Sequence, residues 1–499
     1  MSETLNTLLN FMPVLFIWLL GVIFLLVVIT FVYDISQSKN AILRNYPVIG
    51  HFRYLFSNLG EFFRQYFFAM DREEMPFNRA EREWVNHAAA DKDHTIAFGS
   101  TKNLNIPGSS IFINCPFPTL DADAIETKAI TIGAGYSQNP YVAKSIFNIS
   151  AMSYGAVSKP AILALSSGAK MAGCWLNTGE GGLSPYHLQS GADLVFQIGT
   201  AKYGVRDGNG ALSDTKLAEI AQHSQVKMFE IKISQGAKPG KGGILPGVKV
   251  TGEIARIRGI EKGQDSISPN RHIEISNAAE MLDMIEHVRN VTQKPVGFKT
   301  VVGHIRWLET VLDEIVQRGV ESAPDFITID GGDGGTGAAP MALMDNVGLP
   351  LKEALPVVVD AIVKAGLRDR IKIIASGKLI TPSDVAWALC AGADFVTSAR
   401  GFMFAIGCIQ SLKCNKNTCP TGITTHNKRL QQGLNPIKKA IKVKNYVKNM
   451  TQTVETIAHS CGVKEVRGLN RTHVRIVQNN GQSIPMNQLC PICSEGENL

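Results

Sequence analysis

Short apolar runs rich in β-branched residues alternate with longer amphipathic stretches between residues 146 and 398. This alternation is typical of parallel strands that are each followed by a helix. It predicts eight strands, at residues 146–152, 175–178, 194–199, 228–233, 296–301, 326–330, 371–376 and 395–398. The helices predicted between them include residues 159–171, 213–223, 278–290, 305–318, 351–365 and 382–391.

Eight strand–helix units favour an α/β fold of the (β/α)8 barrel type over a doubly wound sheet, which usually has fewer strands. A doubly wound sheet usually also has an early Gly-x-Gly-x-x-Gly turn. None follows the first predicted strand, so a nicotinamide site is not indicated. We expect the barrel at residues 131–430 and a helix and tail at 431–499. A partly helical region at 35–130 precedes the barrel, and its aromatic residues between 46 and 68 either lie on a membrane surface or pack under the barrel.

An uncharged run of 23 residues, Phe11 to Tyr33, precedes this region. An α-helix of that length spans a hydrocarbon core of ~30 Å. A cleaved signal peptide is the alternative, but the run lacks a basic leading segment and a small-residue cleavage site. We therefore expect residues 1–34 to form a retained, single-pass anchor. Only Glu3 is charged before it whereas Lys39 and Arg44 follow, so the large C-terminal part is expected in the cytoplasm, at the inner membrane.

The net charge of +7 is modest for 499 residues, and no basic run is interleaved with aromatic residues. A nucleic-acid partner is therefore not expected, and the lysines and arginines are expected to form an ordinary solvated surface. The nine cysteines are odd in number and unevenly placed, which argues against a secreted disulfide framework.

A glycine-rich loop follows the sixth predicted strand, with five glycines in the seven residues after Asp330. Such a loop lets the backbone approach a flat cofactor or a phosphate. The segments 376–378 and 398–401 end the last two strands, where barrels commonly hold a phosphate. Lys378 is a candidate charge near a flavin ring, and a plain surface lysine is the alternative.

Two other loops carry charged residues. Lys238 and Lys241 lie in the glycine-rich segment QGAKPGKGG, and Arg258 follows twenty residues after Lys238. These cations suit a dicarboxylic acid, although solvated loop cations are the simpler interpretation. Glu180, in NTGEGG after the second strand, either binds an amino or imino group or caps the next helix.

Three cysteines, Cys408, Cys414 and Cys419, follow the last strand with the spacing Cx5Cx4C. They lack the CxxC pairs and the fourth ligand of a typical zinc site, and three thiolates suit a 3Fe–4S cluster. On spacing alone, buried cytosolic thiols fit as well. Cys490 and Cys493 near the C-terminus are interpreted as metal-binding, redox-active or inert.

Taken together, these motifs resemble the FMN-binding synthase domain of glutamate synthase over residues 90 to 430. The resemblance rests on ISAMSYGAVS, NTGEGG, AKYGV, EIKISQGAKPGKGG, ISPN, GGTGAAP, GLP, LRDRI and the cysteine box with NTCPTGI. The chain is similar in particular to stand-alone, membrane-anchored proteins of the FMN-binding glutamate synthase family.

The resemblance implies a site, a set of cofactors and a reaction. It implies 2-oxoglutarate or its imine at Gln235, Lys238, Arg258 and Glu180, with Glu180 and Lys238 also catalytic, and a 3Fe–4S cluster on Cys408, Cys414 and Cys419. The candidate FMN-binding residues are Ala151, Met152, Ser153, Gln197, Lys299, Asp330, Gly331, Gly334, Gly335, Gly337, Ser376, Gly377, Lys378, Ala399 and Arg400.

The chain also departs from the family. From this sequence we expect neither a glutaminase domain nor a C-terminal β-helix. Asp330 and Gly332 stand where the family usually carries Ser and His. The expected activity is that of an oxidoreductase acting on CH-NH2 donors, which reductively aminates 2-oxoglutarate or a related oxo acid with ammonia or an amino donor. The electron donor (ferredoxin, a reductase subunit or quinol) and homo-oligomerisation stay open. The alternatives are a membrane-associated electron-transfer flavoprotein and a non-catalytic sensor.

Overall fold

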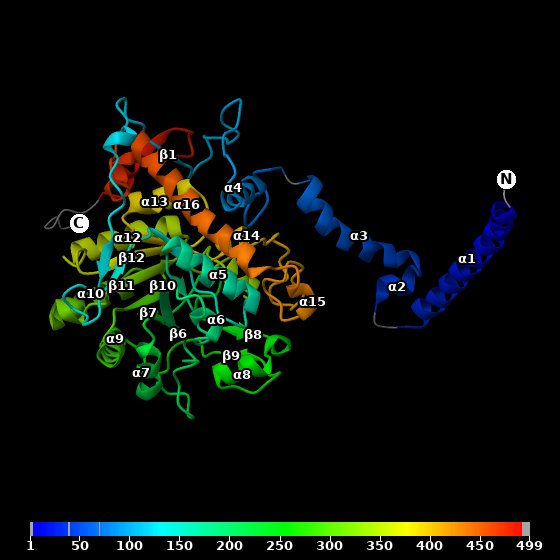
Figure 1. Ribbon diagram of the computed structural model, residues 1–499, viewed down its shortest axis with the longest axis horizontal. Coiled ribbons are helices and arrows are strands. Elements are labelled where there is room, and N and C mark those ends of the chain that lie inside the picture. Colours follow the sequence, from blue (N-terminus) through cyan, green and yellow to red (C-terminus); the bar gives the residue numbers. More distant parts are fainter. Residues whose placement is uncertain (1–2, 38–39, 69, 492–499) are drawn as a thin grey trace. The chain divides into compact units, whose positions relative to one another are not determined.

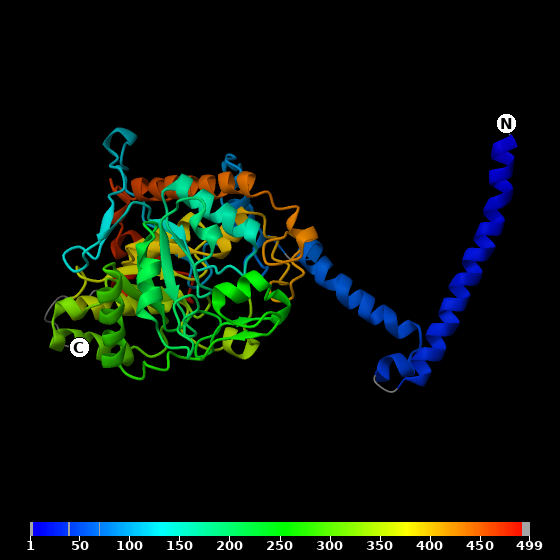
Figure 2. The ribbon, with the colours of Figure 1, turned by 60° about the horizontal axis from the view of Figure 1, so that its bottom comes forward.

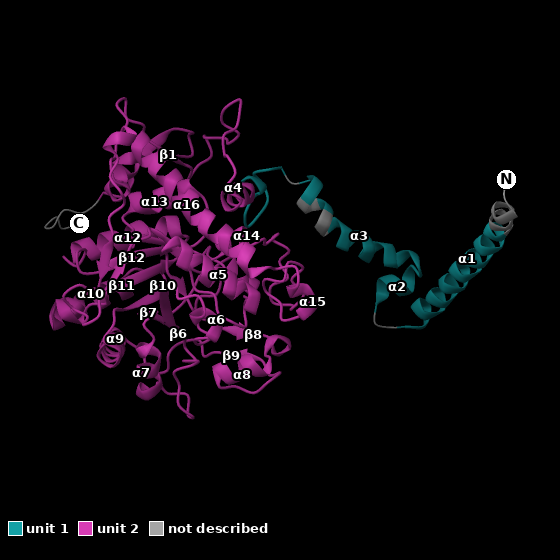
Figure 3. Ribbon diagram, in the orientation of Figure 1, with its two compact units in different colours: residues 1–80 teal, residues 81–499 magenta. Residues whose placement is uncertain are grey.

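The computed structural model describes residues 3–37, 40–68 and 70–491. The chain divides into two compact units, Met1–Ala80 and Glu81–Leu499 (Figure 3). We describe each unit by itself.

The larger unit is built on a closed barrel of eight parallel strands, in the order β10-β11-β12-β13-β4-β5-β6-β7 (Figures 1 and 2). The strands are β4 (Phe147–Ile149), β5 (Leu176–Asn177), β6 (Leu194–Ile198), β7 (Val226–Lys232), β10 (Val296–Val301), β11 (Phe326–Asp330), β12 (Lys372–Ser376) and β13 (Phe395–Ser398). Nearly every residue in them is buried, as expected for a parallel sheet that is covered on its outer face. All eight predicted strands and the barrel are confirmed.

Helices surround the barrel, and the six predicted ones are present. They are α5 (Lys159–Ala172), α7 (Asp214–Gln222), α9 (Ala278–Thr292), α10 (Arg306–Arg318), α12 (Leu351–Lys364) and α13 (Pro382–Ala391). The long helix α16 (Pro436–Ser460) lies along α5 (Figure 1). The two helices approach so closely that a Cβ on Gly168 would lie 2.3 Å from Cβ of Val443.

The amino-terminal end of the barrel is closed by a hairpin of β2 (Ile130–Ile132) and β3 (Tyr141–Ala143). Its buried side chains join one apolar cluster with residues at the beginnings of the strands, among them Trp175, Phe326 and Phe395. The opposite, carboxyl-terminal end is therefore the one that can hold a site.

Segments before and after the barrel form one further sheet. Strand β14 (Val474–Val477) pairs antiparallel with β1 (Ser110–Phe112) on one side and with β15 (Ser483–Pro485) on the other. Helix α17 (Met486–Leu489) ends next to Cys490, whose carbonyl accepts a hydrogen bond from Arg471. Cys493 lies outside the described residues.

The remaining elements of the larger unit are short. They are α4 (Arg79–Ala89), α6 (Pro185–Leu188), β8 (Ile244–Leu245), α8 (Gly252–Arg258), β9 (Ser266–Ile267), α11 (Met341–Met344), α14 (Arg400–Ala405), α15 (Lys428–Gln431) and 3-10 turns at Asp121–Asp123, Gly247–Lys249, Val320–Ser322, Val466–Gly468 and Arg471–His473. Strands β8 and β9 pair with each other within the long connection that follows β7.

The smaller unit contains α1 (Glu3–Ser36), α2 (Ala41–Asn45), α3 (Ile49–Phe63) and a π-helical turn at Arg64–Phe68. Within α1, residues Phe11–Ser36 are long and apolar enough to cross a membrane, and none of the most apolar window is buried. Asp34 near the end of α1 is fully buried, and it accepts a hydrogen bond of 2.8 Å from the Val48 backbone and pairs with His51 at 3.0 Å. These contacts tie the end of α1 to the start of α3.

Candidate active site

The carboxyl-terminal ends of the barrel strands bring most of the predicted site residues to one end of the fold. Glu180 follows β5, and Gln235 and Lys238 follow β7, whereas Lys299 and Asp330 lie in β10 and β11. The others lie at or after the ends of β4, β6, β11, β12 and β13, except Arg258, which ends α8 in the connection after β7.

Glu180 lies in a group of three cations. Its carboxylate is 2.9 Å from Nζ of Lys232. Burial by itself would raise the pKa of Glu180, but Lys232, Lys238 and Arg258 hold this pKa below its usual value. One carboxylate therefore faces three positive groups, and the cluster has an excess of positive charge in a water-poor environment.

Lys238 is 3% exposed, and within the described part of the chain no carboxylate forms an ion pair with it like that between Glu180 and Lys232. Its burial and the neighbouring Lys232 lower its pKa to about 8, although Glu180 acts in the opposite direction. A bound anion would offset both unfavourable effects. The site therefore favours an anionic ligand.

Arg258 is also buried, and it contacts three different segments. Its terminal nitrogens donate to Ser266 Oγ at 3.2 Å and to Ser153 Oγ and the Tyr154 carbonyl at 3.5 Å. Its guanidinium lies over the ring of Tyr203, 5.2 Å from the centroid. The buried Nε has no hydrogen-bond partner among the described residues. The guanidinium is thus held in place with donor capacity to spare.

The glycines of the predicted motifs let three loops pack around Glu180. A Cβ on Gly199 would lie 2.6 Å from Cβ of Glu180, and one on Gly243 would lie 2.4 Å from its Oε1. Likewise, a Cβ on Gly236 would lie 2.2 Å from the carbonyl oxygen of Gly331. These contacts need the absence of a side chain, which explains Gly236 and Gly243 of QGAKPGKGG and also Gly199 after β6.

Two charged residues of the site, Glu230 and Lys232, were not predicted as functional residues. They lie two residues apart in β7, in the motif EIKIS, so both side chains point to the same face of the strand. Two charged residues at this spacing in a buried strand are the sequence signal that could have identified them. Lys232 also donates to the amide oxygen of Gln235. It therefore orients both Glu180 and Gln235.

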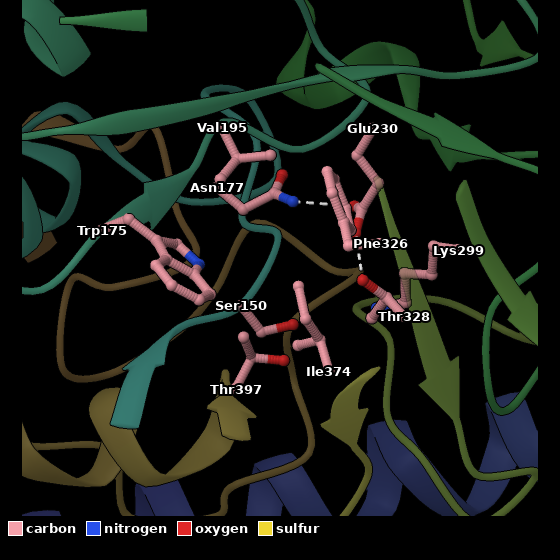
Figure 4. A pocket seen from close by; sticks show the side chains of 10 residues that line it. All are labelled: Ser150, Trp175, Asn177, Val195, Glu230, Lys299, Phe326, Thr328, Ile374 and Thr397. Atoms are coloured by element: carbon pink, nitrogen blue, oxygen red, sulfur yellow. Dashed lines mark hydrogen bonds between the residues drawn. The ribbon is translucent and has the colours of Figure 1, made fainter. Parts of the chain in front are cut away.

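Glu230 lies inside the barrel, two residues before Lys232 in β7. Lys232, Lys238 and Arg258 form the cationic group around Glu180. The carboxylate of Glu230 accepts hydrogen bonds from Asn177 at 2.7 Å and from Thr328 at 2.6 Å (Figure 4). Gln197 donates a third hydrogen bond to it at 2.7 Å. Gln197, predicted to bind the cofactor, directs its amide to this carboxylate. Asn177, Glu230 and Thr328 line a cavity of about 10 Å³, which has room for about one water molecule. The cavity is too small for a substrate.

The predicted flavin-binding loops lie beside the cationic group. Asp330 pairs with Lys299 at 3.2 Å and accepts a hydrogen bond of 2.9 Å from the Gly236 backbone. The Gly331 backbone donates to the carbonyl of Ser376 at 2.9 Å, so the loops after β11 and β12 are joined.

A glycine of the loop after β11 also packs against Arg400, which follows β13. A Cβ on Gly335 would lie 2.7 Å from Nε of Arg400, so the backbone of the β11 loop lies directly on that guanidinium. Lys378 has a left-handed φ of 51°, which is uncommon outside glycine and typical of functional turns. Closely packed glycine backbone next to the half-buried cations of Arg400 and Lys378 fits a phosphate-bearing cofactor such as FMN.

The three cysteines lie on one irregular segment after α14. The Gln410 backbone donates to Sγ of Cys408 at 3.4 Å, and Sγ of Cys419 lies 3.4 Å from the Thr421 hydroxyl. Burial raises the pKa of Cys408 to about 12, whereas hydrogen bonds from Thr421 and Thr424 outweigh burial and lower the pKa of Cys419. All three are free thiols.

The cysteine segment is strained and partly buried. Gln410, Leu412 and Asn417 all have left-handed φ values between 55° and 58°. In the described part of the chain, no three His, Cys, Asp or Glu residues converge tightly enough for a single metal ion. A cluster that takes one thiolate per iron does not require such convergence, so three thiols on a constrained loop fit that chemistry.

Comparisons with known proteins agree with this geometry. Residues 114–464 match the family described as the conserved region in glutamate synthase. The chain is 41% identical over 497 residues to the glutamate synthase large subunit-like protein YerD of Bacillus subtilis, with 92% of this chain and 94% of that protein covered.

More distant relatives carry the activity in their names. The archaeal glutamate synthase [NADPH] of Methanocaldococcus jannaschii is 35% identical over 341 residues, which cover 67% of this chain and 63% of that protein. Among solved structures, a mandelate oxidase complex aligns with 79% of this chain and 98% of its own at 16% identity and a TM-score of 0.47, too distant to bear on function. On its motifs, barrel and relatives, the chain belongs to the glutamate synthase domain family, whose members are oxidoreductases acting on CH-NH2 donors.

Proposed function

We propose that this protein reductively aminates 2-oxoglutarate, or a closely related oxo acid, to glutamate. The observation that carries the proposal is the buried group of Lys232, Lys238 and Arg258 around the single carboxylate of Glu180. Three buried cations with one anion need further negative charge, and a dicarboxylate supplies it. The family membership favours the same substrate class.

Each residue of the group has a proposed role. Lys238 and Arg258 bind the two carboxylates, because both are buried cations with donors to spare. Glu180 holds the amino or imino nitrogen, since its lowered pKa keeps it anionic at neutral pH. Lys232 acts as a positioning residue, because it contacts both Glu180 and Gln235. The glycine contacts let the backbone approach Glu180 closely and leave its side chain 16% exposed.

FMN is the cofactor that this site is proposed to hold, and when bound it supplies the hydride for the reaction. The residues that would hold it are those of the loop after β11, from Asp330 to Gly337, with Ser376, Gly377 and Lys378 after β12 and Ala399 and Arg400 after β13. The close packing of Gly335 on Arg400 supports this placement. Ala151, Met152, Ser153 and Lys299 would border the same cofactor.

A 3Fe–4S cluster is proposed on Cys408, Cys414 and Cys419, and it would carry electrons singly to the flavin. The segment is joined to the loop after β4 by Lys249, whose Nζ donates to the Ala156 carbonyl at 2.6 Å and to the Cys414 carbonyl at 3.3 Å. His426 bonds to the Gly155 carbonyl at 2.8 Å. These two contacts fix the cysteine segment against a proposed flavin-binding loop.

The test compares two lysines of one loop. Lys238→Ala should abolish oxo-acid turnover while the flavin stays bound, because Lys238 is buried beside Glu180. Lys241→Ala should leave turnover intact, because Lys241 is exposed. Turnover is measured as reoxidation of chemically reduced flavin by 2-oxoglutarate and ammonia, with flavin absorbance as the control for binding. Retained turnover in Lys238→Ala would contradict the assignment.

A second function, electron transfer between a membrane donor such as quinol and another acceptor, is favoured by the exposed apolar helix α1. A quinone that reoxidises the flavin in place of 2-oxoglutarate would establish it. A non-catalytic sensor would purify without flavin absorbance. The electron paramagnetic resonance spectrum of anaerobically purified protein tests the cluster, and Cys414→Ser should remove its signal.

The membrane assignment is also a proposal. We expect α1 to cross the inner membrane once and the barrel to face the cytoplasm, since basic residues follow the helix. Externally added protease should leave the barrel intact in spheroplasts and digest it only after lysis. Digestion in intact spheroplasts would reverse the orientation.

A further inference from the structure

The chain's net positive charge is concentrated in one segment. Residues 395–454 hold ten of the 50 lysines and arginines and none of the 43 aspartates and glutamates. The rest of the chain therefore carries a slight excess of acidic residues. The overall composition predicts an ordinary solvated surface, and in this segment the charges are instead all basic.

The structure places most of these charges on one exposed face. In the first half of α16, Val443 and Tyr446 are buried, whereas Ile437 is 75% and Ile441 is 48% exposed on the opposite side. We define the basic face as the exposed residues Leu412, Lys413, Lys416, Lys428, Arg429, Ile437, Lys438, Ile441 and Lys444.

The cysteine segment, α15 and the start of α16 lie side by side at one end of the larger unit in both views (Figures 1 and 2). One contact joins the start of the cysteine segment to α16, since a Cβ on Gly407 would lie 2.7 Å from Nζ of Lys439. The basic face therefore includes the surface of the segment that carries the three cysteines.

We propose that the basic face docks on the anionic surface of a lipid bilayer. Lysines near an anionic leaflet each add to the electrostatic attraction, and aliphatic side chains among them can enter the headgroup region. Leu412 and Ile437 are 67% and 75% exposed, with lysines next to both in the sequence. This combination of charge and exposed aliphatic residues fits an interfacial surface.

The connection of the chain favours a membrane over a soluble acidic protein. The smaller unit, with α1, ends at Ala80, and α4 then packs its end on α16 through hydrogen bonds from Asn449 to the Ala88 carbonyl (2.9 Å) and from Asn445 to the Ala89 carbonyl (3.3 Å).

Near the middle of α4, the ring of Trp84 lies 6.1 Å from the ring of Tyr446 in α16, centroid to centroid. The polypeptide that leaves the proposed anchor thus enters the larger unit beside the basic face. An acidic carrier protein shares the charge complementarity but not this connectivity. The inference rests on the proposed membrane anchoring and deepens it, because it places the cysteine segment against the lipid.

Hydrogen exchange of the full chain in lipid nanodiscs tests the proposal. Discs of phosphatidylcholine alone are compared with discs that also contain phosphatidylglycerol, so that α1 is inserted in both. Peptides that cover residues 409–417 and 428–444 should exchange severalfold more slowly in the anionic discs, and high salt should remove the difference.

A charge-reversed variant and its control make the test specific. Lys428→Glu, Lys438→Glu and Lys444→Glu together should abolish the lipid-dependent protection. The same change at the exposed Lys170, Lys262 and Lys364 should not. Equal exchange in both kinds of disc, or protection that persists in the first variant, overturns the proposal.

Slower hydrogen exchange that requires an added acidic electron-carrier protein, and not anionic lipid, would also overturn the membrane proposal. It would show that the basic face binds a protein partner. Turnover with a soluble chemical reductant in detergent is measured on the same samples. It should be unchanged in both triple variants, and its absence in the unmodified protein would instead count against the proposed function.

Discussion

Lys238→Met should stabilise the protein while it removes oxo-acid binding. Lys238 is 3% exposed, and its pKa is lowered from 10.5 to about 8, chiefly by burial and then by the charge of Lys232. The folded state therefore opposes the charged form of this lysine. Methionine has a similar length and no charge, so it removes the unfavourable effect.

The magnitude follows from the two pKa values. Below pH 8 the lysine is charged in both the folded and the unfolded chain, and the folded state is destabilised by about 3 kcal/mol. Because the folded pKa is the lower one, this destabilisation fades as the pH rises from 8 towards 10.5. At pH 9.5 only about 1 kcal/mol is left. The gain from methionine should shrink in the same way.

The assay is thermal unfolding of the purified full chain in detergent at pH 7 and at pH 9.5. At pH 7, Lys238→Met should raise the midpoint by several °C, and at pH 9.5 the rise should be much smaller. Lys241→Met is the control and should change neither midpoint, because Lys241 is exposed. 2-Oxoglutarate should stabilise the unmodified protein and not Lys238→Met.

Two results would refute the reasoning. A lower midpoint for Lys238→Met at pH 7 would mean that Lys238 is satisfied in the folded protein. A gain of equal size at both pH values would mean that methionine stabilises by packing and not by removing a charge.

Three further predictions concern single contacts. Gly236→Ala should lower the flavin content of the purified protein, since its Cβ would lie 2.2 Å from a backbone oxygen, whereas Gly337→Ala, with nothing within 4 Å of its Cβ, should not. Asp330→Asn leaves the cation of Lys299 unpaired and should raise the flavin midpoint potential in a redox titration; an unchanged potential would place this pair away from the flavin. Asp325→Asn leaves two buried arginines without their carboxylate and should lower the free energy of unfolding in urea by about 3–5 kcal/mol, and a loss below about 1 kcal/mol would contradict that.

The barrel and most of the site follow from the order of residues along the chain. Eight apolar runs separated by helical stretches allow few other arrangements, and parallel strands bring their carboxyl-terminal ends to one side. Residues that end strands, such as Asp330 and Ser376, are therefore expected near one another from the strand pattern alone. Glycine spacing in the loops indicates close backbone contacts, and the folded chain contains them at Gly199, Gly236 and Gly243.

Which charges share one environment depends on the packing of the folded chain. Glu230 and Lys232 lie inside a strand whose pattern indicates burial. Only the closed barrel shows that Glu230 accepts hydrogen bonds from side-chain amides in the barrel interior and that Lys232 pairs with Glu180. The charges of α15 and α16 look ordinary one by one, and packing gathers them on one face. Electrostatic interactions depend on distance and burial, and a linear sequence specifies neither for residues that lie far apart along the chain.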